Sequence, residues 1–219
     1  MLYYVARFTE SGRQCISYAV SDHPAGPFVD LNPEPFVCQL DQGGSIDPEP
    51  FVAPDGSLYL LWKNDGSRAA ACRVALQPAA QRRWTHAAGR TASPDPKDQA
   101  WEEPLIENPT MYFHDGKYYL LYSANWYEGP NYAVGYAVCD SPSGPCTSPG
   151  HADPRLRWAA RGAGETSFFT DADGSLWLAY HAWIVPNVGY PVGMRQLHLE
   201  RVTFEGGDLQ AGQPMSDDQ

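Results

Sequence analysis

The chain has 219 residues, of which 43% are hydrophobic and 13% aromatic, and its formal net charge is −11. This length suffices for one domain with a sizeable core. The negative charge argues against a nucleic-acid partner because phosphates would be repelled, and no apolar run is long enough for a transmembrane helix. An acidic chain suits a neutral ligand such as a sugar. Twenty glycines, twenty prolines and many aromatic residues favour short strands joined by turns, which is typical of an all-β fold.

Residues 2–8 resemble a strand rather than a signal peptide. None of the five cysteines has the spacing of a zinc site, so no metal ligation by thiolates is expected. Cys139 and Cys146 flank a tight turn, and Cys15 and Cys38 flank a related one. Two disulfides at these places, with Cys72 free, would indicate an exported protein. Buried unpaired thiols are the alternative, and a cytoplasmic location then stays open.

One sequence frame occurs three times along the chain. In each copy an acidic residue lies eight positions before the aspartate of an Asp-Gly turn, and aromatic and aliphatic runs bracket the turn. An Asp-Gly pair in this setting predicts a β-hairpin. We interpret the frame as a repeat that brings one acidic side chain per unit to a shared place. The three acids are Asp47, Glu107 and Glu165.

Four-stranded units at periods of about 40–60 residues are typical of propeller blades. A third strand after each hairpin, closed by a Pro- and Gly-containing turn at 21–28 and again at 139–146, completes such a unit. We therefore expect one incomplete β-propeller domain over residues 1–219. Its expected blades are a partial one at 1–30 and full ones at 45–90, 106–150 and 164–205.

Carboxylates at one position of successive blades would point toward the propeller axis. Glycoside hydrolysis needs a pair of them, one to protonate the leaving oxygen and one to activate water or attack. Glu107 stands in an apolar, proline-bounded run, which favours the protonated form that a general acid requires. The alternative is a solvated glutamate at a strand end. Asp47 precedes Pro48, which predicts an extended backbone, and an Asp turn or cap is its alternative.

The segments Ser-Ile-Asp-Pro-Glu-Pro-Phe at 45–51 and Leu-Ile-Glu-Asn-Pro-Thr-Met at 105–111, with their hairpins, resemble glycoside hydrolase family 43. The resemblance covers nearly the whole chain. It implies a five-bladed β-propeller that acts on α-L-arabinofuranosides and β-D-xylosides with inversion. Under it, Glu107 matches the general acid, and Asp47 matches the aspartate that modulates the pKa of the acid and orients it. Arg195 matches a substrate-contacting arginine, although without the family it would read as a surface arginine on a strand.

The sequence departs from the family pattern at two places. The family's catalytic base is an aspartate in the first blade, and no residue here matches it, so the resemblance implies about three blades plus a partial one with the first blade missing. An acid without a base leaves water unactivated, and this chain is then expected to be inactive alone. At Glu165 many members have a histidine that helps to hold an ion. No cofactor is required, and an axial Ca²⁺ is left open.

Four aromatic residues lie on loops after predicted inner strands, where their rings could stack on a sugar. We expect Trp126 to contact substrate, and packing between blades is the alternative for each of the four. His114 and His181 have no visible partner and are interpreted as structural. The aromatic residues are Trp126, Tyr127, Trp183 and Tyr190.

The expected function is hydrolysis of α-L-arabinofuranosyl or β-D-xylosyl linkages in plant polysaccharides such as xylan and arabinan, or in their oligosaccharides, by an inverting acid/base mechanism. The expected partner is thus an arabinose- or xylose-containing saccharide, with no nucleic acid and no membrane. The rival hypothesis is a catalytically silent carbohydrate-binding propeller that keeps Glu107 and Asp47 as hydrogen-bond acceptors.

Overall fold

The computed structural model describes residues 1–66, 73–77, 90–91, 100–148 and 161–211. Within these ranges the regular elements are strands, apart from two short 3₁₀ helices, η1 (Leu40–Gln42) and η2 (Ala100–Glu102). The part of the chain described contains no helix long and apolar enough to cross a membrane. The prediction of an all-β fold is therefore confirmed.

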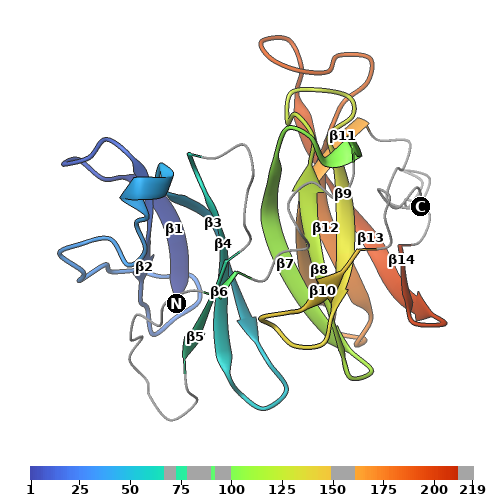
Figure 1. The fold of residues 1–219 in the computed structure, drawn as a ribbon, viewed down its shortest axis with the longest axis horizontal. Coiled ribbons are helices and arrows are strands. Elements are labelled where there is room, and N and C mark those ends of the chain that lie inside the picture. Colours follow the sequence, from blue (N-terminus) through green and yellow to red (C-terminus); the bar gives the residue numbers. More distant parts are fainter. Residues whose placement is uncertain (67–72, 78–89, 92–99, 149–160, 212–219) are drawn as a thin grey trace.

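The strands form one two-stranded sheet and three four-stranded sheets, all antiparallel, in which neighbouring strands follow one another in sequence (Figure 1). The two-stranded sheet contains β1 (Leu2–Arg7) and β2 (Gln14–Ala19). The next contains β3 (Ser45–Val52), β4 (Leu58–Asn64), β5 (Arg73–Gln77) and β6 (Arg90–Thr91). The third contains β7 (Ile106–His114), β8 (Lys117–Ala124), β9 (Ala133–Cys139) and β10 (Cys146–Thr147). The last contains β11 (Arg161–Thr170), β12 (Leu176–Trp183), β13 (Arg195–Glu205) and β14 (Asp208–Ala211).

The first strands of the four sheets lie next to one another. β3 contacts β1 and β7, and β7 contacts β11. Residues of β1, β3, β7 and β11 line a common cavity of about 600 Å³. Sheets that each present their first strand to a shared axis are the arrangement of a propeller, so the described sheets form a partial β-propeller.

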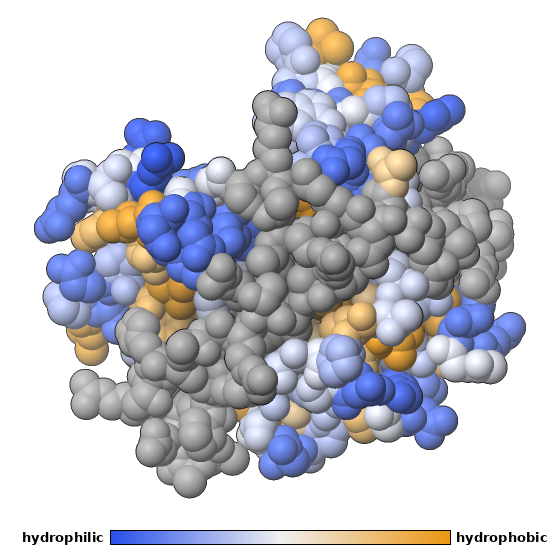
Figure 2. All heavy atoms as spheres, viewed as in Figure 1, coloured by the Kyte–Doolittle hydropathy of each residue, from blue (hydrophilic) through white to orange (hydrophobic). Residues whose placement is uncertain are grey.

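The middle strand β8 is apolar on both faces because its sheet is packed between two others. On β8, Leu120 faces the β3–β6 sheet and packs with Leu61 and Phe51. Its neighbours Tyr119 and Leu121 face the opposite way, toward the β11–β14 sheet. Burying each such leucine is worth roughly 1.5–3 kcal/mol. Most described residues on the face drawn in Figure 2 are hydrophilic, as the net charge leads one to expect.

Both cysteine pairs are disulfides. Cys15 is bonded to Cys38, and Cys139 is bonded to Cys146. The second bond joins the paired residues of β9 and β10 and closes the turn between them. The alternative of unpaired thiols is thereby wrong for these four residues, and Cys72 lies outside the described residues.

A buried carboxyl group lies within the last sheet, away from the axis. Glu200 on β13 is 1% exposed, and the hydroxyl of Tyr180 donates to its Oε2 at 3.4 Å. Burial raises the pKa of Glu200 to about 8. The folded chain thus holds a proton here over a pH range in which an unfolded chain has lost it.

Glu200 therefore predicts a fall in stability as pH rises toward 8, because the folded state binds more protons than the unfolded state. Burial also raises the pKa of Asp47, to about 7, so Asp47 likewise lowers stability as the pH rises. His181, whose pKa is lowered, acts in the opposite sense only below about pH 6.5. We expect the melting temperature of the wild-type chain to fall between about pH 6.5 and 8. Glu200→Gln should flatten this dependence, as measured by calorimetry in matched buffers.

Glu205→Gln is the matched control, because it removes one charge at an exposed position of the same strand. It should keep the wild-type pH dependence. A Glu200→Gln profile parallel to that of the wild type would contradict the assignment of a neutral Glu200.

Candidate active site

The first strands of three sheets break register at the same point. In each, two successive residues lie opposite a single residue of the second strand, which is the pattern of a β-bulge. The inserted pairs are Asp47-Pro48 on β3, Asn108-Pro109 on β7 and Glu165-Thr166 on β11.

The first residue of each bulge has a left-handed backbone. The φ angles are 55° at Asp47, 54° at Asn108 and 56° at Glu165. Asn and Asp tolerate this region better than other residues with a side chain, and such conformations gather at functional sites. The expectation of an extended backbone at Asp47 is wrong, because the bulge overrides the preference imposed by Pro48.

Asp47, Asn108 and Glu165 are thus the structurally equivalent residues, and Glu107 lies one position earlier on its strand. The cause is loop length. The β7–β8 hairpin has the two-residue turn 115–116, whereas the β3–β4 and β11–β12 loops have five residues each, 53–57 and 171–175. Counting back from the Asp-Gly turn therefore gives the wrong alignment. The prediction that the three acids occupy one repeat position is wrong for Glu107, whose side chain leaves the strand in a different direction.

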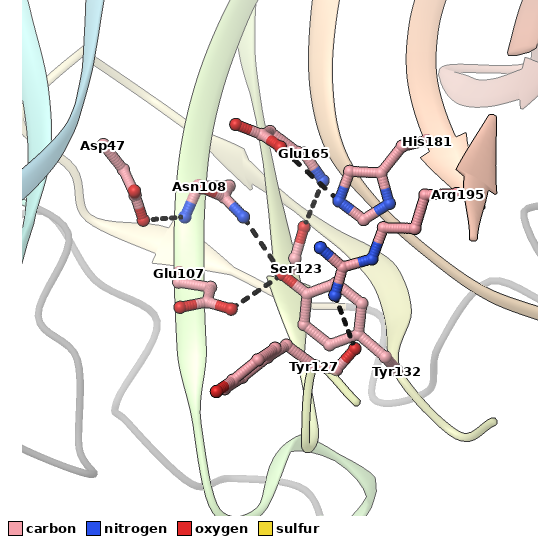
Figure 3. A network of polar contacts seen from close by, with 9 residues as sticks. All are labelled: Asp47, Glu107, Asn108, Ser123, Tyr127, Tyr132, Glu165, His181 and Arg195. Carbon is pink, nitrogen blue, oxygen red and sulfur yellow. Dashed lines mark hydrogen bonds and ion pairs between the residues drawn. The ribbon is translucent and has the colours of Figure 1, made fainter. Parts of the chain in front are cut away.

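The axial cavity is lined by Asp47, Asn108 and Glu165, together with residues of β1 and β2. Glu107 lies beside this wall rather than in it (Figure 3). Its side chain is only 12% exposed, so the alternative of a solvated strand-end glutamate is wrong. Asp47 and Glu107 are brought together from neighbouring sheets around Asn108.

Both oxygens of the Glu107 carboxylate have a partner. The hydroxyl of Tyr132, which lies just before β9, donates to Oε1 at 2.8 Å. The Nζ of Lys63, at the end of β4, lies 3.4 Å from Oε2, and its side chain is 6% exposed. The carboxyl is thus held by a neutral donor from its own sheet and by a cation from the neighbouring sheet.

Asp47 accepts a hydrogen bond from the backbone N–H of Asn108 to Oδ2 at 3.0 Å. Its pKa is raised to about 7, chiefly by burial and then by the negative charge of Glu107. The Asn108 N–H and the positive charge of Lys63 act in the opposite direction. The negative charge of Glu107 thus makes the Asp47 carboxyl harder to ionise.

Tyr132 approaches the backbone of β11 very closely. A Cβ at Gly164 would lie 2.1 Å from its Cε1, so only glycine fits there. On the same side the Tyr132 ring lies nearly parallel to the imidazole of His181, with ring centroids 6.3 Å apart. The hydroxyl that holds Glu107 is thus fixed by packing.

His181 has a partner that sequence reasoning missed. Its Nε2 lies 3.5 Å from Oε2 of Glu165, so the interpretation as a residue without a partner is wrong. Burial, and next the positive charge of Arg195, lower the pKa of His181 to about 4, so the imidazole is neutral at pH 7. His114, in contrast, stacks on Phe204 with ring centroids 3.8 Å apart, away from the axis.

The donor set near Glu165 does not fit a calcium ion. Ca²⁺ takes six to eight oxygen ligands, whereas here one carboxylate faces an imidazole. Across the ranges given above, no group of three or more His, Cys, Asp or Glu residues is placed to hold a metal. We therefore derive no step through an ion.

Arg195, the first residue of β13, is held in an aromatic pocket. Its guanidinium carbon lies 4.3 Å from the ring centroid of Trp183, 5.5 Å from that of Tyr190 and 6.0 Å from that of Tyr127. Its Nη2 also donates to the backbone oxygen of Tyr127 at 3.0 Å. Arg195 is therefore not a surface arginine, and cation–π contacts fix its position.

Trp126 lies on the loop 125–132, which projects near the loop 184–194 at the top of Figure 1. It is 47% exposed, and its ring contacts that of Tyr127 at 4.9 Å between centroids. It does not line the axial cavity. The described contact of Trp126 is with Tyr127 of its own loop, and its contact with substrate stays a prediction.

Three residues of the site were not found from the sequence: Lys63, Asn108 and Tyr132. Lys63 carried a signal, because it lies at the end of the otherwise apolar strand Leu-Tyr-Leu-Leu-Trp-Lys-Asn. Asn108 was visible only as the neighbour of Glu107. Nothing in the sequence around Tyr132 indicates its contact with a residue 25 positions earlier.

Lys63→Met should destabilise the fold at pH 7 by about 3 kcal/mol, because it leaves the buried Glu107 carboxylate without its cation. Adding Glu107→Gln should restore most of this stability, which a urea-denaturation cycle of the four variants would measure.

The matched control is Lys117→Met. Lys117 forms an ion pair with Asp140 at 2.8 Å, but the two side chains are 52% and 67% exposed. Such a surface pair is worth about 1 kcal/mol or less. Equal losses for the two lysine variants, or no recovery in the double variant, would contradict the buried Lys63–Glu107 pair.

Comparison with known proteins places this site in a family. Residues 1–209 match the sequence profile of Glycosyl hydrolases family 43. The chain is 31% identical over 216 residues to xylosidase/arabinosidase 43A of Humicola insolens, and the match covers 82% of this chain and 61% of that protein. It is 24% identical over 178 residues to the β-D-galactofuranosidase xynD of Aspergillus niger, covering 76% and 46%. The chain thus spans about half to three-fifths of the length of these curated relatives.

Solved structures agree with the sequence comparison. A thermostable family-43 glycoside hydrolase superposes with a TM-score of 0.81 at 26% identity, covering 99% of this chain and 72% of that one. An endo-1,4-β-xylanase of Bacteroides thetaiotaomicron superposes with a TM-score of 0.73 at 25% identity, covering 96% and 74%. The chain belongs to glycoside hydrolase family 43.

Proposed function

We propose that this chain supplies the general acid of a glycosidase that cleaves α-L-arabinofuranosyl or β-D-xylosyl linkages, with Glu107 as the proton donor. One observation carries the proposal: Glu107 is buried beside the wall of the axial cavity, with both oxygens held and a second carboxyl, Asp47, next to it. Neighbouring carboxyls in a low-dielectric site are what acid/base chemistry at a glycosidic oxygen requires. The names of the relatives, a xylosidase/arabinosidase and an endo-xylanase, support the sugar class.

In this mechanism Glu107 gives its proton to the oxygen of the leaving sugar as the glycosidic bond breaks. Tyr132 and Lys63 fix the carboxyl so that the proton is aimed in one direction. After the proton has left, Lys63 stabilises the new carboxylate, and the Tyr132 hydroxyl donates to it. Asp47, whose carboxyl is held by the backbone N–H of Asn108, is proposed to orient the acid.

Arg195 and Trp126 are proposed to contact the sugar. For Arg195 the support is that, among the described side chains, aromatic rings and not a carboxylate hold its guanidinium. Nη2 donates to the backbone oxygen of Tyr127, and the Nη1 donors then remain available for hydroxyl oxygens. Trp126 supports it through its exposed ring on the loop beside Tyr127.

An inverting reaction also needs a carboxylate that activates water. The disulfides Cys15–Cys38 and Cys139–Cys146 support the proposal that the protein works in an oxidising, extracellular compartment.

Glu107→Gln should slow cleavage of xylo- and arabino-oligosaccharides, whose leaving groups need protonation, by about 10²–10⁴-fold. Aryl glycosides with good leaving groups should suffer much less. The assay is run with and without azide, which attacks the anomeric carbon without a general base and gives a glycosyl azide of inverted configuration. Azide-dependent cleavage of oligosaccharides that requires Glu107 would support the proposal even where water alone gives no product.

Two outcomes would contradict the proposal. One is oligosaccharide cleavage that is unchanged in Glu107→Gln. The other is calorimetric binding of these sugars with no cleavage under either condition, which would establish the silent carbohydrate-binding propeller instead. The Glu49→Gln variant, which removes a carboxyl that lines the axial cavity, is the matched control and should retain Glu107-dependent protonation.

A further inference from the structure

A buried serine connects the proposed acid to the neighbouring sheet, and the mechanism described above leaves it unused. Ser123 on β8 lies directly opposite Glu107 on β7 in the strand pairing, and it is 0% exposed. Its hydroxyl has two hydrogen-bond partners, the backbone of Glu165 on β11 and the hydroxyl of Tyr132 (Figure 3). Ser123 thus lies between the acid's own sheet and the bulge of the next sheet.

The hydrogen bonds of Ser123 run in one direction. The backbone N–H of Glu165 donates to Ser123 Oγ at 2.9 Å, which uses an oxygen lone pair and leaves the hydroxyl proton free. Ser123 donates this proton to the Tyr132 oxygen. Burial, and next the charge of Glu107, raise the pKa of Tyr132 well above its usual value, whereas the bond from Ser123 lowers it, as a donated hydrogen bond does. The Tyr132 hydroxyl therefore stays protonated.

Tyr132 transmits this arrangement to the acid, because its hydroxyl donates to Glu107 Oε1 at 2.8 Å. The side-chain amide of Asn108 contacts the same hydroxyl at 3.0 Å, and the bond from Ser123 is separate from this contact. Hydrogen bonds in series polarise one another, so donation from Ser123 makes the tyrosine a stronger donor and a weaker acceptor. Both effects favour the carboxylate form of Glu107 over its protonated form.

We propose that Ser123 is a positioning residue of the general acid, which joins Glu107 through Tyr132 to the bulge of β11. This rests on the proposed function, in which Glu107 is the proton donor. The same bulge acts on Tyr132 a second time, because Gly164, next to Glu165, admits the tyrosine ring. The backbone of one sheet thus sets both the place of Tyr132 and the direction of its hydrogen bonds.

The charged and titratable groups near the acid and Tyr132 are separate from Ser123. Among the described residues, no hydrogen bond or ion pair joins the side chain of any of them to the serine hydroxyl. Ser123→Ala therefore changes the hydrogen bonding of the acid and leaves the charge of the site as it is. These groups are Lys63 of β4, Asp47 of β3, Glu165 of β11, His181 of β12 and Arg195 of β13.

The test is a titration that needs no substrate. The chain is labelled with ¹³C at its Glu carboxyls, and the Glu107 signal is identified by its loss in Glu107→Gln. Its titration midpoint should rise by about 0.3–1 pH unit in Ser123→Ala, because the net worth of one hydrogen bond corresponds to roughly a 2- to 12-fold change in an equilibrium constant. In a Tyr132→Phe background Ser123→Ala should leave the midpoint unchanged, since Ser123 acts through the tyrosine hydroxyl.

Ser45→Ala is the matched control. Ser45, the first residue of β3, is also 0% exposed, and its hydroxyl likewise accepts from a backbone N–H, that of Gln39, at 3.1 Å. It should leave the Glu107 midpoint unchanged. Circular dichroism checks that each variant is folded. If Ser123→Ala does not fold, Ser123→Cys replaces the hydroxyl with a weaker donor and should give a smaller rise of the same sign.

An unchanged Glu107 midpoint in the folded Ser123 variant, or a rise of equal size in the Tyr132→Phe background, would overturn the positioning role. A rise together with oligosaccharide cleavage that does not depend on Glu107 would contradict the proposed function and leave this role standing. Where cleavage depends on Glu107, the basic limb of its pH profile should move to higher pH in Ser123→Ala and not in Ser45→Ala. KM should be retained, because the fully buried Ser123 does not line the axial cavity.

Discussion

The structure around the axis depends on the burial of two carboxyl groups beside each other. Removing an ionised carboxylate from water is expensive, and a second negative charge nearby increases the penalty. The chain meets this constraint with one buried cation, Lys63, one tyrosine hydroxyl and one backbone N–H, and by raising the pKa of Asp47 to about 7. Near neutral pH the pair therefore carries less than two full charges.

The backbone places these groups through repetition with a local irregularity. The first strands β3, β7 and β11 each carry a two-versus-one bulge, and the bulge turns its first residue toward the axis. A regular strand would have alternated past this point, and its side chains would have faced the packed interfaces between sheets. The bulge of β7 differs from the others, because it places Asn108 in the cavity wall and Glu107 directly behind that wall. Gly164 on the next sheet then admits the ring of Tyr132, which no side chain there would allow.

The sequence was informative about local features and uninformative about contacts between sheets. The all-β class, the hairpins, and the presence of Glu107 and Asp47 near one axis follow from turn chemistry and repeat spacing. The one-residue offset of Glu107 did not, because a two-residue turn and a five-residue loop both contain Asp-Gly and look alike in a spacing count. Lys63 and Tyr132 were missed for a different reason. They reach Glu107 from 44 and 25 positions away, and no local pattern encodes such pairings.

The remaining charged groups of the site, those of Arg195 and Glu165, are not paired with each other. Arg195 keeps its charge without a carboxylate among the described side chains, since three aromatic rings and a backbone oxygen hold it. A direct ion pair with Glu165 would have consumed the donors of Arg195 and fixed the carboxylate. Instead the neutral His181 faces Glu165, and the positive charge of Arg195 helps to keep it neutral. The site thus holds two adjacent carboxyls, Asp47 and Glu107, and a guanidinium that aromatic rings rather than a carboxylate hold in place.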